Sequence, residues 1–300
     1  MIFQVFVVGL MAAYLALVTF IIARLVSPTR GLQQIPEKGT TPEPPQDQPT
    51  LELLHVHKSF DRPVIRGISF KVQRGETLGI LGQSGSGKSV TLKLLVGLLK
   101  PDRGYVVFEG KDLARMTERD LLELRKRVSY VFQGGAVFDF LDVRENIAYP
   151  LREMGTMDET MIQDRLEYLL QAVGMEDQDA LHSSKLSIGA KKLVAIARAI
   201  ANDPEVILYD EPTTGLDPLA RKSLSHHIRT LNKQEHLTSV VVTHDLKCLQ
   251  IVADRIILLK DGVIRFEGNQ EEFHTSSDPF VQAFIAGKRF EEEEEEPLSA

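Results

Sequence analysis

The stretch Gly82-Gln83-Ser84-Gly85-Ser86-Gly87-Lys88-Ser89 decides the fold of this 300-residue chain. It has the pattern G-x-x-x-x-G-K-S, and the apolar run 78–81 before it is typical of a buried strand. The run 90–99 after it is typical of a helix. A strand, a glycine-rich loop and a helix in this order form a phosphate-binding P-loop. The alternative, a Gly/Ser-rich turn that binds nothing, does not account for the flanking strand and helix.

The residue types in this loop suit the phosphates and the metal ion of a nucleotide. Glycines let successive backbone N–H groups point at one anion, and the helix N-terminus adds partial positive charge. Lys88 can reach the β- and γ-phosphates, and the Ser89 hydroxyl can bind Mg²⁺. We therefore expect ATP and Mg²⁺ as cofactors. The residues expected to contact ATP here are Gly82, Gln83, Ser84, Gly85, Ser86, Gly87, Lys88, Ser89 and Val90.

The charge of the chain gives no sign of a nucleic-acid-binding face. The formal net charge is -7, and Glu291 to Glu296 supply six of those negative charges, so the remainder is nearly neutral. We therefore expect no nucleic-acid partner. The single cysteine, Cys248, excludes an internal disulfide and is expected to pack in the core.

The N-terminus carries a long apolar stretch at residues 2–22. A helix of that length spans about 31 Å, which matches the hydrocarbon thickness of a bilayer. Arg24 and Arg30 follow it, which predicts that its C-terminal side is cytoplasmic. We expect a transmembrane helix at residues 1–26. A cleaved signal peptide and a buried helix of the globular domain are the alternatives.

Two further segments have the composition of chain outside a packed core. Residues 27–50 contain six prolines among polar residues and are expected to form a flexible linker. Residues 289–300 contain the glutamate run and are expected to form an acidic disordered tail, with an acidic docking motif as the alternative. The globular domain is therefore expected at residues 51–288.

The globular part alternates strand-like and helix-like segments. Short apolar runs at 128–132, 206–209 and 239–242 suit strands of a parallel sheet that is covered on both faces. Helical spacing of apolar residues is found at 158–172, and an Ala/Ile-rich helix is expected at 191–201. The pattern predicts an α/β fold.

Two carboxylates, Asp210 and Glu211, follow the strand 206–209. Asp210 would hold Mg²⁺ beside the P-loop, and Glu211 would orient and deprotonate an attacking water. The alternative is two solvated acids in a loop. It becomes less tenable if this strand lies beside the P-loop strand, because both strands would then end at the same edge of the sheet.

Taken together, these motifs resemble those of the ATP-binding-cassette (ABC) ATPases, in the order found in that family, over residues 51–288. Phe60 resembles the aromatic residue that stacks on adenine. Gln133 resembles the glutamine that senses Mg²⁺ and water and links the ATPase to its transmembrane partner. Asp217, in Gly215-Leu216-Asp217, resembles the D-loop aspartate, and His244 resembles the switch histidine near the γ-phosphate.

The resemblance implies a P-loop fold with a mostly parallel core sheet, an antiparallel β subdomain and a helical subdomain at about 134–190. It also implies a dimer of ATPase subunits, most simply a homodimer, that drives a separate permease. The signature motif is Leu186-Ser187-Ile188-Gly189-Ala190, 23 residues before Asp210 when counted from Ser187. In the family, Ser187 and Gly189 would close over the ATP bound to the opposite subunit. Catalysis would rest on Glu211, His244, Gln133 and Lys88, and the metal would contact Ser89, Gln133 and Asp210.

The signature motif departs from the usual L-S-G-G-Q, since Ile188 replaces a glycine and Ala190 replaces the glutamine. A β-branched residue cannot take a glycine-only conformation, and its side chain could crowd the phosphate. One interpretation is slow hydrolysis, or a partner subunit with a better signature. The other, which we favour, is a tolerated change in a working motif, because Lys88, Asp210, Glu211 and His244 are all intact.

The segments 132–138, 146–153 and 278–284 resemble the ATPase subunits of Mce-type phospholipid transporters. This resemblance implies phospholipid as cargo, an Mce-domain lipid-binding protein as partner, and an inner-membrane location with the ATPase domain on the cytoplasmic side. Two alternatives stay open. One is the ATPase of a generic solute importer, and the other is a non-transport regulator that binds ATP at a degenerate site.

Overall fold

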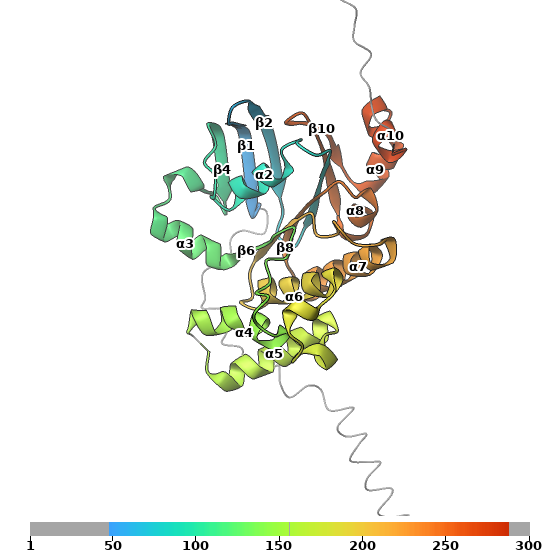
Figure 1. The fold of residues 1–300 in the computed structure, drawn as a ribbon. Helices are drawn as coiled ribbons and strands as arrows, with labels where there is room; N and C mark the ends of the chain where they lie inside the picture. Colours follow the sequence, from blue (N-terminus) through green and yellow to red (C-terminus); the bar gives the residue numbers. More distant parts are fainter. Residues whose placement is uncertain (1–47, 156, 288–300) are drawn as a thin grey trace, which may run out of the picture. The chain divides into compact units, whose positions relative to one another are not determined.

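The computed structural model describes residues 48–155 and 157–287 (Figure 1). The expected membrane helix at 1–26, most of the linker at 27–50 and the acidic tail at 289–300 lie outside the described residues. Within the described ranges, no helix has both the length and the apolar character needed to cross a membrane.

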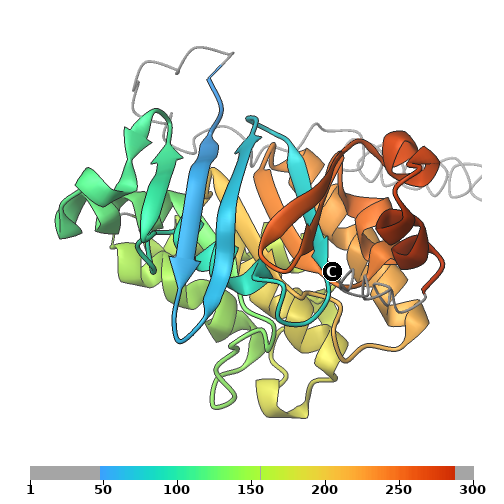
Figure 2. The ribbon, with the colours of Figure 1, turned by 90° about the horizontal axis from the view of Figure 1, so that it is seen from above.

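The strands form two sheets (Figures 1 and 2). The four-stranded sheet is antiparallel, in the order β2-β1-β4-β5, and the six-stranded sheet has the order β10-β9-β3-β8-β7-β6. In the second sheet, only β10 runs antiparallel to its neighbour, β9. The expected mostly parallel core sheet and antiparallel subdomain are therefore confirmed. The strands are β1 (Leu51–Ser59), β2 (Pro63–Val72), β3 (Thr77–Gly82), β4 (Arg103–Phe108), β5 (Lys111–Asp112), β6 (Val128–Val131), β7 (Val206–Asp210), β8 (Thr238–Thr243), β9 (Arg255–Lys260) and β10 (Val263–Gly268).

Helices cover both faces of the six-stranded sheet. On one side α2 packs between the two sheets, and on the other side α4 to α7 gather together (Figure 1). The longer helices are α2 (Lys88–Leu95), α3 (Glu118–Arg127), α4 (Val143–Met154), α5 (Glu159–Val173), α6 (Ile188–Ile200) and α7 (Pro218–Gln234). The shorter ones are η1 (Leu113–Arg115), η2 (Glu176–Gln178), η3 (Ser183–Lys185), α8 (Leu246–Val252), α9 (Gln270–Thr275) and α10 (Pro279–Ile285).

The two-residue repeat of a strand explains how β7 joins both hydrophobic cores. Val206 and Leu208 face the cluster that contains α2 and the antiparallel sheet. Ile207 and Tyr209 face the cluster built with α4 to α8. All four side chains are buried, because alternate residues of a strand point to opposite faces and each face is covered by helices.

One sequence-based expectation needs correction, and the structure answers one question that the sequence left open. The helix expected from Lys191 begins at Ile188, directly after Ser187, so the signature motif forms its first turn. Strand β7 does not lie beside the P-loop strand β3, because β8 pairs with both and separates them.

Candidate functional site: a nucleotide site at one edge of the sheet

The expected catalytic residues meet because three parallel strands end at one edge of the sheet. Strand β3 leads into the P-loop, β7 leads to Glu211, and β8 leads to His244. Although β8 separates the other two, parallel strands place their carboxyl ends at the same edge, which is where open α/β sheets bind ligands. A cavity of about 680 Å³ opens there. It is lined by Arg62, Val64, Gln83, Ser84, Gly85, Gly87, Lys88, Ser89, Val90, Gln133, Glu211 and His244.

The P-loop backbone requires glycine at Gly87 and adopts a left-handed conformation at Gly85. Gly87 is the N-cap of α2 at φ +103°, and a Cβ there would lie 2.5 Å from Cδ1 of Ile65. Gly85 has φ +83°. The loop folds back around Lys88, whose Nζ donates to the carbonyl oxygens of Gly82 at 2.8 Å and Gln83 at 3.0 Å. A buried ammonium is thereby held at the floor of an anion-binding loop.

Ser89 and Asp210 form a pair of oxygen ligands at one side of this loop. Ser89 Oγ donates to Asp210 Oδ1 at 2.9 Å, and Tyr130 Oη donates to Asp210 Oδ2 at 2.8 Å. Burial and the neighbouring Asp210 carboxylate raise the pKa of Tyr130, so the phenol stays a donor. A hydroxyl and a carboxylate are hard oxygen donors, which fit Mg²⁺ bound by few protein groups together with substrate phosphates. No cluster of three or more His, Cys, Asp or Glu suited to a metal occurs among the described residues.

Glu211 is held by donors on one of its oxygens. Its Oε2 lies 2.8 Å from Nδ1 of His244 and accepts from the hydroxyls of Thr214 and Thr243, each at 3.1 Å. Its Oε1 lies 3.5 Å from Nζ of Lys88. Burial tends to raise the pKa of Glu211, but the hydrogen bond from His244 and the charges of His244 and Lys88 outweigh it and hold the pKa below 4.5. At neutral pH this side chain is an ionised carboxylate that lines the cavity.

The backbone at Glu211 is unusual. Its φ is +48°, in the left-handed region that side chains other than glycine rarely adopt. The conformation is stabilised by a hydrogen bond from Glu211 N to the carbonyl oxygen of Val242 at 2.9 Å. Strained backbone of this kind is often found at functional sites.

Gln133 and Phe60 are placed differently. Gln133 lines the cavity, and its carbonyl oxygen accepts from Nζ of Lys192 at 3.0 Å. The Phe60 ring is 56 % exposed, and Phe60 is not among the residues that line the cavity. Arg62 and Val64, from the same β1–β2 hairpin, line it instead.

The signature and D-loop residues lie away from this chain's own P-loop cavity. Ser187 is the N-cap of α6 and accepts from Ala190 N at 3.2 Å, and Ile188 is 59 % exposed. Ile188 is helical and has no positive φ, so its backbone is not strained. At Gly189, a Cβ would come no closer than 3.8 Å to Leu216. Asp217 is the exposed N-cap of α7, and hydrogen bonds from the amides of that first turn lower its pKa.

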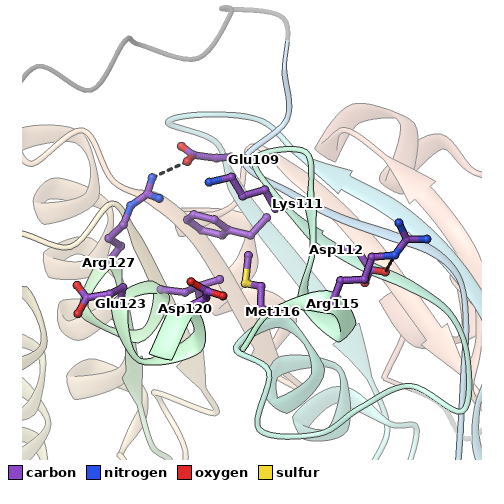
Figure 3. Close-up of a pocket in the computed structure, with 10 residues that line it drawn as sticks. Glu109, Lys111, Asp112, Arg115, Met116, Asp120, Glu123 and Arg127 are labelled. Atoms are coloured by element: carbon purple, nitrogen blue, oxygen red, sulfur yellow. Dashed lines mark hydrogen bonds and ion pairs between the residues drawn. The ribbon is translucent and has the colours of Figure 1, made fainter. Parts of the chain in front are cut away.

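A second hollow, of about 450 Å³, lies between β4, β5 and α3 (Figure 3). Arg127 donates to Glu109 at 2.6 Å there, and its guanidinium lies 4.7 Å from the centre of the Phe108 ring. Arg115 lies 3.5 Å from Asp112. Both arginines of this hollow are thus paired with acidic side chains that also line it.

Sequence reasoning missed several residues of the nucleotide site. Tyr130 lies in the strand that ends just before Gln133, and only the structure reveals its bond to Asp210. Thr214 and Thr243 both contact Glu211, and each lies within three residues of an expected catalytic residue. A hydroxyl near a catalytic carboxylate in sequence is a weak but available signal.

Comparison with known proteins agrees with this geometry. The model of the ABC transporter family matches residues 65–214. The intermembrane phospholipid transport system ATP-binding protein MlaF of Haemophilus influenzae is 38% identical over 77% of this chain and 88% of its own length. The methionine import ATP-binding protein MetN of Mesorhizobium japonicum is 36% identical over 76% of this chain and 63% of its own length. Among solved structures, a dimeric ATP-binding cassette in a post-hydrolysis state with ADP and Pi is 31% identical, with a TM-score of 0.66, over 73% of this chain and 98% of that one.

Proposed function

This chain belongs to the ABC transporter family and is an ATPase that binds ATP with Mg²⁺, and we propose that it powers a separate permease that moves phospholipid. The observation that supports hydrolysis is the meeting of Lys88, Ser89, Asp210 and Glu211 at one edge of the sheet. The observation that supports phospholipid as cargo is the 38% identity to a phospholipid transport ATPase over most of both chains.

In this proposal, each residue acts through charge and position. Lys88 and the P-loop amides neutralise the phosphates of ATP. Ser89, Asp210 and Gln133 would hold Mg²⁺, which supplies charge stabilisation at the phosphates. Glu211, ionised at neutral pH, takes a proton from the attacking water. His244 donates to Glu211 and orients it. Phe60 would stack on the adenine ring from the exposed turn between β1 and β2.

The signature and D-loop residues, which do not line the P-loop cavity, would act in hydrolysis if two subunits pair. Ser187 and Asp217 are exposed in a single chain and Gly189 is partly exposed, and all three would contact the nucleotide of a second copy. A Cβ at Gly189 would make only ordinary contacts, at 3.8 Å or more, so packing within the described residues does not require glycine there. The similar solved cassette is itself a dimer.

We extend the proposal to the surroundings of the ATPase. The apolar residues 2–22 would tether the chain in the inner membrane, with residues 51–288 on the cytoplasmic side. The permease would be a separate protein, because one helix cannot form a translocation path, and an Mce-domain protein would bind the lipid. The match to a methionine import ATPase favours a solute importer as the second candidate.

A pull-down of the full-length chain in mild detergent tests the proposal. We expect a permease, an Mce-domain protein, enriched phospholipid, and ATP turnover that is lost in Glu211→Gln. A permease with a solute-binding protein and no enriched lipid would favour the importer. ATP binding without turnover and without a permease would favour a regulator built on the altered signature.

A further inference from the structure

Helix α6 holds the segment that follows Gln133 through three basic side chains, which we call the α6 clamp: Lys191, Lys192 and Arg198. Lys192 Nζ donates to the carbonyl oxygen of Gln133 at 3.0 Å. Arg198 donates to the carbonyl oxygen of Gly135 at 3.3 Å, and Lys191 pairs with Asp139 at 2.6 Å. The segment is therefore fixed to α6 at three points along its length.

Packing reinforces these bonds. Gly135 has φ +76°, and a Cβ there would lie 3.3 Å from Cβ of Ala195, so its backbone lies directly on α6. The guanidinium of Arg198 lies 5.1 Å from the centre of the Phe138 ring. Since α6 begins at the signature motif, its first turn and the Gln133 segment form one packed unit.

Lys192 is the member of the clamp that bonds to Gln133, a residue that lines the ATP cavity. It is buried, and it lines a hollow with Gln133, Ile188 and Thr214. Burial lowers the pKa of Lys192, while the charge of Glu211 opposes that shift. Geometry therefore places the Lys192 side chain at the main chain of Gln133, in a hollow that the first turn of α6 also lines.

We propose that Lys192 is a positioning residue, which places the Gln133 side chain at the ATP cavity and makes it follow movements of α6. This inference rests on the proposed function, because it assumes that Gln133 acts in ATP hydrolysis. It adds a direct link between the signature helix and Gln133 within one subunit. A shift of α6 on contact with a partner would then reach the catalytic site through the clamp.

The test is a double-mutant cycle in the full-length chain, with ATP turnover measured in the complex that it forms. Lys192→Met should lower kcat about tenfold. KM for ATP should stay within about twofold, because Lys88 and Ser89 keep their contacts. Lys192→Arg should recover most of the loss, because it keeps a cationic donor. Lys222→Met, an exposed lysine on α7, is the matched control and should equal wild type.

Gln133→Ala keeps the carbonyl that Lys192 contacts but removes the side chain that Lys192 positions. If Lys192 acts through Gln133, the double variant Lys192→Met/Gln133→Ala should be no slower than Gln133→Ala. The inference would be overturned if the two losses in kcat multiplied in the double variant. It would also be overturned if Lys192→Met had the same kcat as the Lys222→Met control. A wild-type complex without turnover would instead refute the proposed function.

A weaker variant covers the case in which Lys192→Met does not fold. Asp139→Asn loosens the same segment at an exposed ion pair and should leave the melting temperature nearly unchanged. It should lower kcat by about twofold to threefold with an unchanged KM. Wild-type kcat in a well-folded Asp139→Asn variant would count against the clamp.

Discussion

The hydrogen bond from Tyr130 to Asp210 gives a prediction whose size follows from the structure. Tyr130→Phe removes one hydroxyl and keeps the ring, which lies 4.4 Å from the ring of Phe132 between centroids. Asp210 is buried, and its Oδ2 accepts the phenol at 2.8 Å. Hydrogen bonds to charged groups contribute about 1.5–3 kcal/mol. Because Tyr130 is only partly buried, we expect a loss of about 2 kcal/mol in the free energy of unfolding.

Two other tyrosines calibrate this value. Tyr209→Phe removes a buried bond between neutral groups, to Asn232 at 2.9 Å, and should cost about 1 kcal/mol. Tyr105 is 53 % exposed on β4, and Tyr105→Phe should cost close to nothing. The expected order of destabilisation is Tyr130, then Tyr209, then Tyr105.

Urea unfolding without nucleotide or Mg²⁺ measures all three variants. The urea concentration at the unfolding midpoint should fall for Tyr130→Phe and Tyr209→Phe. The slope of the free energy of unfolding against urea concentration should stay constant, since the surface exposed on unfolding is unchanged. A Tyr130→Phe variant as stable as Tyr105→Phe would refute the claim that this phenol stabilises the Asp210 carboxylate.

Three further predictions concern Glu211 and Ile188. Glu211→Gln should lower kcat by about 10²-fold or more while ATP still binds, because the amide cannot take a proton. Rapid-quench measurement of ATP turnover and a nucleotide-binding assay check this. Near-normal turnover in the variant would exclude Glu211 as the base. The pKa of Glu211 lies below 4.5, so its contribution to stability is complete above pH 4.5 and is lost as the pH falls through the lowered value. The difference in unfolding free energy between wild type and Glu211→Gln should therefore shrink below pH 4.5, and a difference that grows there would contradict the assignment. Ile188→Gly should change ATP turnover by no more than about threefold. It should lower the free energy of unfolding by up to about 1 kcal/mol, because glycine is unfavourable in the first helical turn. A tenfold gain in turnover would show that the Ile188 side chain obstructs the site.

The P-loop could be predicted from the sequence because its chemistry is local. Residues 82–89 supply the turn, the N–H groups and the ammonium from consecutive positions, and the flanking patterns identify the strand and helix. The pair Asp210 and Glu211 could be found for the same reason, since an apolar strand that ends in two acids is visible in the chain. A motif whose parts are adjacent in sequence needs no knowledge of tertiary packing.

The order of strands could not be predicted in this way. The sequence left open which strand lies beside β3, and the structure inserts β8 between β3 and β7. Parallel strands pair through backbone groups that are the same for every residue, so side-chain patterns do not identify the neighbour. The backbone conformation of Ile188 likewise needed the structure, because only the start of α6 at that residue shows its backbone to be ordinary helix.

The sequence by itself determined the phosphate-binding loop on an α/β sheet and the two acids that end a second apolar strand, because hydrophobic period and glycine spacing encode local structure. Only the tertiary structure decided how those groups are held. Tyr130 reaches Asp210 across 80 positions, and Lys192 reaches Gln133 across 59. Such bonds depend on which strand ends and helices become neighbours after folding, and no periodicity within a single segment carries that information.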